Sequence, residues 1–197
     1  SGRRSTRRGY ILRFDWRLKM VESPLHIYVD GSCEENRNVT ESTPAGWGFC
    51  VVDGDSGIGR GGGDVIAERS GPVVTNPSEN DYLGAEVGSN NTAELTAIGH
   101  AARWILSQPG EGVVVIRGDS QYALNIASGA WRAKANQDLA ESVKALWMEV
   151  DSVRGLRGEH VRAHRGHRWN ERADHLAFRA MQGESPLPLQ FWKPGQR

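Results

Sequence analysis

Hydrophobic and polar positions alternate through the first part of the chain, and the apolar period then lengthens to that of helices. Alternation of β-branched and aromatic residues is typical of strands, whereas apolar residues three or four positions apart indicate helices. The strands expected on this basis are 26–30, 45–52, one of 64–70 or 71–75, 112–117 and 159–163. The expected helices are 92–106, 120–127, 137–150 and 171–181.

Strands that come first and then alternate with helices are typical of a mixed sheet flanked by helices, so the expected fold class is α/β. The chain has 197 residues, 38% of them hydrophobic, and can therefore bury one core. We expect one domain at 23–183, preceded by a basic arm at 1–22. The tail at 184–197 contains three prolines from Ser185 onward and is expected to be an extended appendage.

The net charge of zero conceals an uneven distribution. Residues 1–20 hold seven basic residues and one acidic residue, so the rest of the chain carries 17 basic and 23 acidic residues, net −6. A basic arm on an acidic domain can grip nucleic-acid phosphates. The alternative is that residues 1–19 are vector-derived or otherwise non-native, because Ser1-Gly2 resembles a cloning remnant and Met20 offers a natural start.

Cysteine content and hydropathy bear on location. Cys33 and Cys50 are too few for a disulfide framework and favour a reducing compartment. No apolar run reaches the roughly 20 residues of a membrane span, and no signal-peptide pattern opens the chain. We therefore expect an intracellular, cytoplasmic protein that does not enter a membrane.

Four acidic residues lie near the ends of expected elements. Asp30 ends the first expected strand, and Asp119 follows a later strand that would lie beside it. Glu94 falls in the first turn of a helix, and Asp174 near the start of the last helix. Four acids converging on one sheet edge would repel one another unless cations lay between them. Oxygen ligands suit Mg²⁺, and two such ions make a site for in-line phosphoryl displacement.

Each acid taken alone has a simpler explanation. Asp30-Gly31-Ser32 is a common type of turn, and Glu94 would suit the N-terminus of any helix. Asp174 can cap its helix or pair with Arg172. The metal-site interpretation depends on all four occurring together, in this order and with these neighbours.

With those neighbours, the acids form segments that resemble type 1 ribonuclease H, in the family's order over about residues 25–182. The segments are Asp30-Gly31-Ser32-Cys33, Asn90-Asn91-Thr92-Ala93-Glu94-Leu95, Asp119-Ser120-Gln121 and His164-Arg165-Gly166-His167-Arg168-Trp169-Asn170-Glu171-Arg172-Ala173-Asp174. The resemblance implies an RNase H-like fold with a five-stranded mixed sheet. It also implies a Mg²⁺-dependent endonuclease that cuts the RNA strand of RNA–DNA hybrids and leaves 5′-phosphate and 3′-hydroxyl ends.

The resemblance also implies a division of roles among the acids, around two Mg²⁺ ions for which Mn²⁺ is a substitute. Asp30 would bridge both ions, and a shared carboxylate can set the roughly 3.5–4 Å spacing that such chemistry needs. Asp174 would serve the ion that activates the attacking water. Glu94 and Asp119 would hold the ion on the leaving side.

His164 lies ten residues before Asp174, at the position of a mobile histidine in the family. An imidazole there can transfer a proton or help product release near neutral pH. The alternatives are a solvent-exposed or phosphate-contacting histidine, and His167 is close enough in sequence to be confused with it.

Recognition of RNA depends on the 2′-hydroxyl, which amide side chains can bind as donors and acceptors. The residues expected to contact the hybrid are Cys33, Asn36, Ser89, Asn90, Asn91 and Gln121. Among these, the contacts of Cys33 and Asn36 are implied by the family resemblance, which also places Ser89 at a DNA-strand phosphate. The alternative for the two adjacent asparagines is helix capping.

The chain departs from the family in two places. Most of the basic protrusion of some relatives is missing, and only residues 129–135 remain, in which Trp131, Arg132 and Lys134 offer stacking and charge; Trp131 is equally a candidate core or lid residue. Scattered arginines between 154 and 172 could compensate for the loss. Residues 57–62 match Gly-x-Gly-x-x-Gly, but no helix is expected after them, so we expect a flexible hairpin tip and no dinucleotide cofactor.

Two other functions compete with the monomeric hydrolase. One is a module that binds hybrids or double-stranded RNA with little catalysis, and the other is a strand-transfer domain of the same superfamily. Four carboxylates argue against the first. The amide residues and the histidine loop argue against the second.

Overall fold

A computed structural model describes residues 23–197. The basic arm predicted at 1–22 lies outside the described residues. Five strands form one mixed sheet in the order β3-β2-β1-β4-β5. The strands are β1 (Leu25–Cys33), β2 (Ala45–Asp53), β3 (Asp64–Pro72), β4 (Val114–Gly118) and β5 (Leu156–His160). β1, β2 and β3 pair antiparallel, whereas β4 lies parallel to both β1 and β5.

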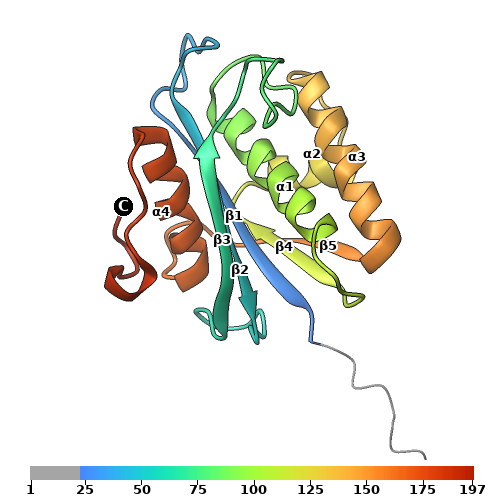
Figure 1. Cartoon of the computed structure of the whole chain (residues 1–197), viewed down its shortest axis with the longest axis vertical. Helices are drawn as coiled ribbons and strands as arrows, with labels where there is room; N and C mark the ends of the chain where they lie inside the picture. The colour runs from blue at the N-terminus through green and yellow to red at the C-terminus, as the bar shows by residue number, and fades with distance from the viewer. Residues whose placement is uncertain (1–22) are drawn as a thin grey trace, which may run out of the picture.

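The helices cover both faces of the sheet (Figure 1). They are α1 (Asn90–Leu106), α2 (Gln121–Ser128), α3 (Gln137–Arg154) and α4 (Arg168–Gln182), followed by the short 3₁₀ turn η1 (Leu189–Phe191). α1 packs on β1 and β2 with α2 and α3 beside it, and α4 packs on β1, β2 and β3 from the other face. The predicted α/β class, with a five-stranded mixed sheet flanked by helices, is confirmed.

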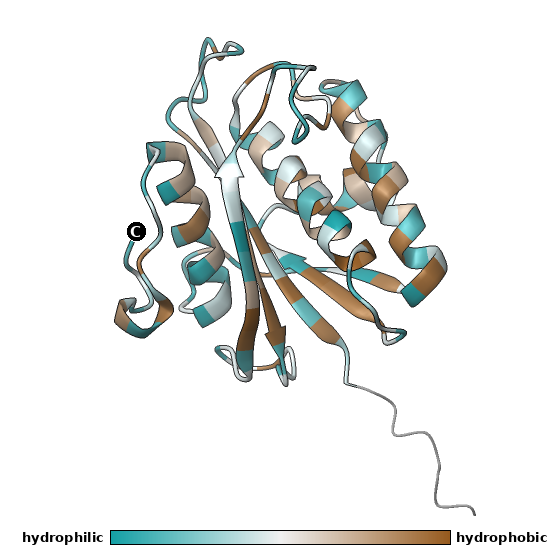
Figure 2. Ribbon diagram, in the orientation of Figure 1, coloured by the Kyte–Doolittle hydropathy of each residue, from teal (hydrophilic) through white to brown (hydrophobic). Residues whose placement is uncertain are grey.

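Strand alternation divides β1 between two cores. Ile27 and Val29 belong to the larger core with α1, α2 and α3, while Tyr28 belongs to a smaller core beneath α4. Figure 2 shows the resulting brown, apolar positions along the strands, with teal positions interspersed on the helices. Asp30 follows Tyr28 by two residues, so its side chain lies on the α4 face of the sheet.

Several predicted element boundaries were wrong, among them those of the last strand and of the last helix. The last strand is 156–160 and not 159–163, because it is an edge strand whose residues are mostly exposed and show little apolar pattern. The last helix begins at Arg168 and not at 171, because the His167 ring nitrogen caps it by accepting a hydrogen bond from the Asn170 N–H. No helix among the described residues is both long and apolar enough to cross a membrane.

The C-terminal tail, predicted to be an extended appendage, is held against the domain by side-chain contacts. The tail folds back along α4 (Figure 1), and Trp192 is only 5% exposed. The Leu187 N–H donates to His175 Nε2 at 2.9 Å, and Arg172 Nη1 donates to the Leu187 carbonyl at 2.9 Å. Prolines exclude a long helix or a paired strand here. They do not prevent side-chain packing. That packing could not be predicted, because the apolar residues of the tail follow neither the helix nor the strand period.

Candidate active site

Asp30 does not end its strand, contrary to the sequence prediction. β1 continues to Cys33, and Asp30 pairs with Gly48 of β2. The parallel pairing of β1 with β4 stops two residues before Asp30, at Tyr28 and Arg117. Asp119 follows β4 directly, so the Asp30 and Asp119 side chains meet where β4 has ended.

Glu94 reaches the same place from the other side of the sheet. Ser89 caps α1, so Glu94 lies in the second turn of the helix and not in the predicted first turn. Gly31 permits the approach, because a Cβ atom there would lie 2.4 Å from the Glu94 backbone nitrogen. Glycine after Asp30 therefore allows α1 to lie directly against β1.

The three carboxylates form a compact group. One ligand oxygen from each of Asp30, Glu94 and Asp119 lies within 4.8 Å of the others. Burial, followed by the charges of Glu94 and Asp119, raises the pKa of Asp30 well above its ordinary value. Burial raises the pKa of Glu94 to about 8, and burial and the charge of Asp174 raise that of Asp119.

This donor set fits a hard divalent cation. The group offers only carboxylate oxygens, which Mg²⁺, Mn²⁺ and Ca²⁺ prefer. The raised pKa values show that the group is unfavourable when fully ionised and alone. A divalent cation would relieve that repulsion.

The raised pKa of Glu94 predicts a pH-dependent stability. The folded protein holds the Glu94 proton more tightly than the unfolded chain does, so the stabilising contribution is complete below the ordinary pKa of 4.5 and is lost as the pH rises through about 8. Without divalent metal, the parent protein should therefore lose stability relative to Glu94→Gln as the pH rises over this interval.

Urea unfolding in EDTA at several pH values measures this difference, and the Glu94→Gln comparison cancels the titration of the buried histidines. Added Mg²⁺ should stabilise the parent more at the alkaline end than at the acidic end. A constant difference between the two proteins across the interval would contradict the prediction.

Asp174 is not part of the compact group in this structure. It lies two turns into α4, further than the sequence predicted, and its two oxygens accept hydrogen bonds from Arg197 Nε and Nη2 at 3.1 Å each. The predicted alternative partner, Arg172, pairs instead with Glu68. Asp174 nevertheless lies close enough to raise the pKa values of Asp30, Glu94 and Asp119 by its charge.

His164 lies in the exposed loop between β5 and α4, with a left-handed backbone φ of 54°. Its charge opposes the rise in the pKa of Asp119, which places the imidazole within electrostatic range of the carboxylate group. His160 is also close, because its Nε2 lies 3.1 Å from the Asp119 carbonyl oxygen.

Sequence reasoning missed His160 and Arg197. Neither belongs to a motif, and the contact of Arg197 depends on the folding back of the tail. No signal in the sequence could have identified either contact.

The residues predicted to contact substrate lie on the chain segments that carry or adjoin the three carboxylates. The Cys33 thiol donates to Asn36 Oδ1 at 2.9 Å, just after β1. The Ser89 hydroxyl accepts from the Thr92 N–H at 3.1 Å as the helix cap, so capping does not explain the two asparagines. Within residues 23–197, the exposed side chains of Asn90, Asn91 and Gln121 form no hydrogen bond and can donate to a ligand.

A groove extends from Asn91 across α2. It has a volume of about 380 Å³, and its lining includes Tyr122, Trp131, Arg132 and Lys134. Trp131 is 53% exposed, so it is not a core residue.

The model of the RNase H family matches residues 22–182. The chain belongs to the RNase H family. The sequence prediction of a ribonuclease H enzyme is therefore confirmed. A ribonuclease H of Thermosynechococcus vestitus is 28% identical over 178 residues, which cover 85% of this chain and 94% of the relative. One of Chromobacterium violaceum is 30% identical over 173 residues, 82% of this chain and 97% of the relative.

Solved type 1 ribonucleases H share the fold. The RNase H1 of Halobacterium salinarum superposes with a TM-score of 0.58 and 25% identity, covering 81% of this ribonuclease H and 98% of the archaeal chain. LC11-RNase H1, isolated from compost and crystallised in complex with an RNA/DNA hybrid, superposes with a TM-score of 0.55 and 22% identity. These structures cover 81% of this chain, and the second matches over 97% of its own length.

Proposed function

We propose that this ribonuclease H hydrolyses the RNA strand of RNA–DNA hybrids with divalent metal ions and leaves 5′-phosphate and 3′-hydroxyl ends. The observation that carries the proposal is the compact group of Asp30, Glu94 and Asp119 in a member of this family. The proposed substrate is inferred from the relatives, which are ribonucleases H, and from the hybrid bound to LC11-RNase H1.

Each acidic residue has a role in this proposal. Asp30, at the centre of the group, would be shared between two Mg²⁺ ions, with Glu94 and Asp119 on the side of the leaving oxygen. Asp174 would serve the side of the attacking water once its carboxylate is free of Arg197. When bound, the ions supply Lewis-acid stabilisation of the phosphoryl charge and lower the pKa of water.

His164 would move a proton near this group. It is exposed on a short loop, within electrostatic range of Asp119, and an imidazole exchanges protons near neutral pH. From the loop, His164 would reach the leaving oxygen without occupying the space between the three carboxylates.

Recognition of the hybrid would combine amides and a groove. The unpaired amides of Asn90, Asn91 and Gln121 flank the carboxylates and can bind the 2′-hydroxyls that distinguish RNA from DNA. The neighbouring groove presents Trp131 with Arg132 and Lys134, which supports stacking and phosphate contact in place of the missing protrusion.

Cleavage of end-labelled duplexes tests the proposal. With Mg²⁺ or Mn²⁺ we expect the RNA strand of the hybrid to be cut, and RNA–RNA and DNA–DNA duplexes to remain intact. The products should carry 5′-phosphates that a phosphatase removes. If the purified protein binds the hybrid but leaves it uncut, it is a binding module and not a hydrolase. If it joins DNA ends, it is a strand-transfer enzyme.

A further inference from the structure

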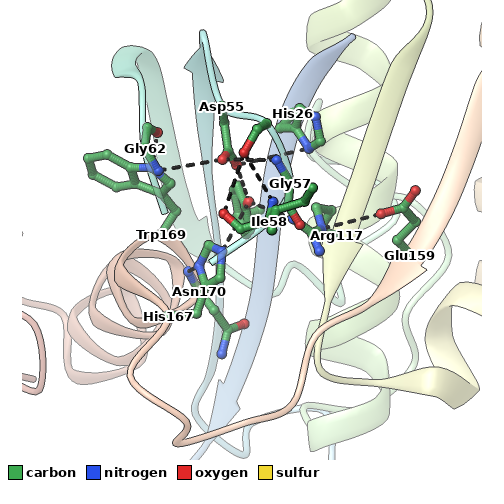
Figure 3. Close-up of polar contacts among 12 residues, drawn as sticks. His26, Asp55, Gly57, Ile58, Gly62, Arg117, Glu159, His167, Trp169 and Asn170 are labelled. Carbon is green, nitrogen blue, oxygen red and sulfur yellow. Dashed lines mark hydrogen bonds and ion pairs between the residues drawn. The ribbon is translucent and has the colours of Figure 1, made fainter. Parts of the chain in front are cut away.

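A second buried polar cluster, of which Figure 3 labels Asp55, Arg117 and His167, lies on the α4 face of the sheet, the face that also carries the Asp30 side chain. We call Tyr28, Asp55, Arg117 and His167 the tyrosine network. Tyr28 precedes Asp30 by two residues, and Arg117 precedes Asp119 by two residues in the neighbouring strand. All four side chains belong to residues less than a tenth exposed.

The hydrogen bonds of this network run in one direction. His167 Nδ1 accepts from the Asn170 N–H, so Nε2 carries the proton and donates to the Tyr28 hydroxyl oxygen at 3.3 Å. Arg117 Nη1 donates to the same oxygen at 3.0 Å, and the hydroxyl proton goes to the Asp55 carboxylate. Tyr28 therefore joins the cap of α4 to the sheet and to the β2–β3 hairpin.

Asp55 is held in its ionised form by the hairpin. Burial alone would raise its pKa, but the hydrogen bonds from Tyr28 and from the N–H groups of Gly57 and Gly62 outweigh burial and lower it. An ionised acceptor makes the bond from Tyr28 stronger than a neutral one would.

The glycine-rich hairpin, expected to be a flexible tip, docks on the start of α4. The Arg168 N–H donates to the Arg60 carbonyl at 2.7 Å, and Trp169 Nε1 donates to the Gly62 carbonyl at 2.7 Å. A Cβ atom on Gly61 would lie 3.0 Å from Trp169 and 3.2 Å from His167, so glycine permits this contact. The run that matches a dinucleotide motif therefore serves as a docking surface in this fold.

The loop that carries His164 is anchored at both ends. At its start, the Val161 N–H donates to the Gly118 carbonyl at 2.8 Å, directly before Asp119. At its end, His167 is fixed by the tyrosine network. Residues 162–166 span the two anchors, and His164 lies in their middle, so the anchors limit where its imidazole can go.

We propose, on the basis of the proposed function, that Tyr28, Asp55 and Arg117 are positioning residues which act through His167 to hold His164 against the carboxylate group. None of the three joins that group, so they are not catalytic residues themselves. Removing the Tyr28 hydroxyl would loosen the His167 ring at one end of the loop, while the Arg168–Arg60 backbone contact and the carboxylates stay in place.

The test is a double-mutant cycle with Tyr28→Phe and His164→Ala. Tyr28→Phe should lower kcat about three- to ten-fold with KM unchanged, the range that follows from losing one hydrogen bond in a group that acts in proton transfer. In the His164→Ala background the same substitution should have no further effect on kcat. Tyr82→Phe is the matched control, because the Tyr82 hydroxyl forms no hydrogen bond among the described residues.

An equal loss of kcat in both backgrounds would show a merely structural role and overturn the inference, as would an unchanged kcat in Tyr28→Phe. Should Tyr28→Phe fail to fold, Asp55→Asn replaces it in the cycle with the same expectations.

The His164 ring signals in NMR spectra at fixed pH provide a readout that does not depend on cleavage. They should shift in Tyr28→Phe and not in Tyr82→Phe, and unshifted signals would overturn the inference. If the parent protein proves inactive, the proposed function fails and the NMR comparison alone decides whether the network positions His164.

Discussion

Asp30→Asn is expected to abolish hybrid cleavage and at the same time to stabilise the metal-free fold. If Asp30 is shared between two cations as proposed, an amide could not replace its carboxylate, so activity should fall by more than about a thousandfold, the scale of losing a central electrostatic contribution to catalysis. The fold gains because Asp30 is only 3% exposed and lies against Glu94 and Asp119. Removing the charge of Asp30 removes its repulsion with both Glu94 and Asp119.

Single-turnover cleavage and thermal unfolding in EDTA measure the two effects. Asp138→Asn, on the exposed start of α3, is the matched control and should change neither quantity appreciably. Added Mg²⁺ should raise the unfolding temperature of the parent more than that of Asp30→Asn. A variant that cuts at the parental rate would remove Asp30 from the proposed mechanism, and one that unfolds earlier would contradict the repulsion argument.

Among the substitutions considered, Glu68→Ala is expected to lower the free energy of unfolding the most. Arg172 is 1% exposed, and its Nε and Nη2 donate to the two Glu68 oxygens at 2.6 and 2.9 Å. Without that carboxylate, the buried guanidinium keeps, among residues 23–197, only the Leu187 carbonyl and the face of Trp192. Breaking a buried pair costs about 3–5 kcal/mol, and we expect the lower end because the Glu68 side chain is 23% exposed.

Urea unfolding measures this loss. Glu184→Ala breaks the more exposed pair with Arg179 and should cost less than about 1 kcal/mol. Replacing both members of the buried pair by methionine should restore much of the stability, because no charge is then left without a partner. A double variant less stable than Glu68→Ala would show that the stability comes from the attraction within the ion pair. The cost of a buried charge without a partner would then be the smaller effect.

The sequence was most informative where local pattern decides structure. Alternation in β1 separates Ile27 and Val29 from Tyr28 and Asp30, and the motif segments identified the acids that converge. Arg172 shows the opposite case, because nothing near it in sequence indicates that Glu68, 104 positions away, is its partner. The register of Tyr28 with Arg117 likewise depends on the pairing of strands far apart in the chain.

The start of α4 and the packing of the tail were not predicted for the same reason. The α4 cap is a histidine whose role depends on the network beneath it, and the tail packs by contacts that have no period. Both are tertiary effects that override local propensity.

If Asp174 ligates an ion as proposed, its contact with Arg197 would make tail docking and cation binding at Asp174 competitive. A carboxylate that is held by a guanidinium through both oxygens cannot at the same time ligate an ion through them. By thermodynamic reciprocity, whatever loosens the tail tightens ion binding at Asp174, and ion binding there loosens the tail by the same factor. Under the proposed mechanism, Trp192 and His175, which hold the tail on α4, would thereby help to set the metal concentration at which the Asp174 carboxylate becomes available.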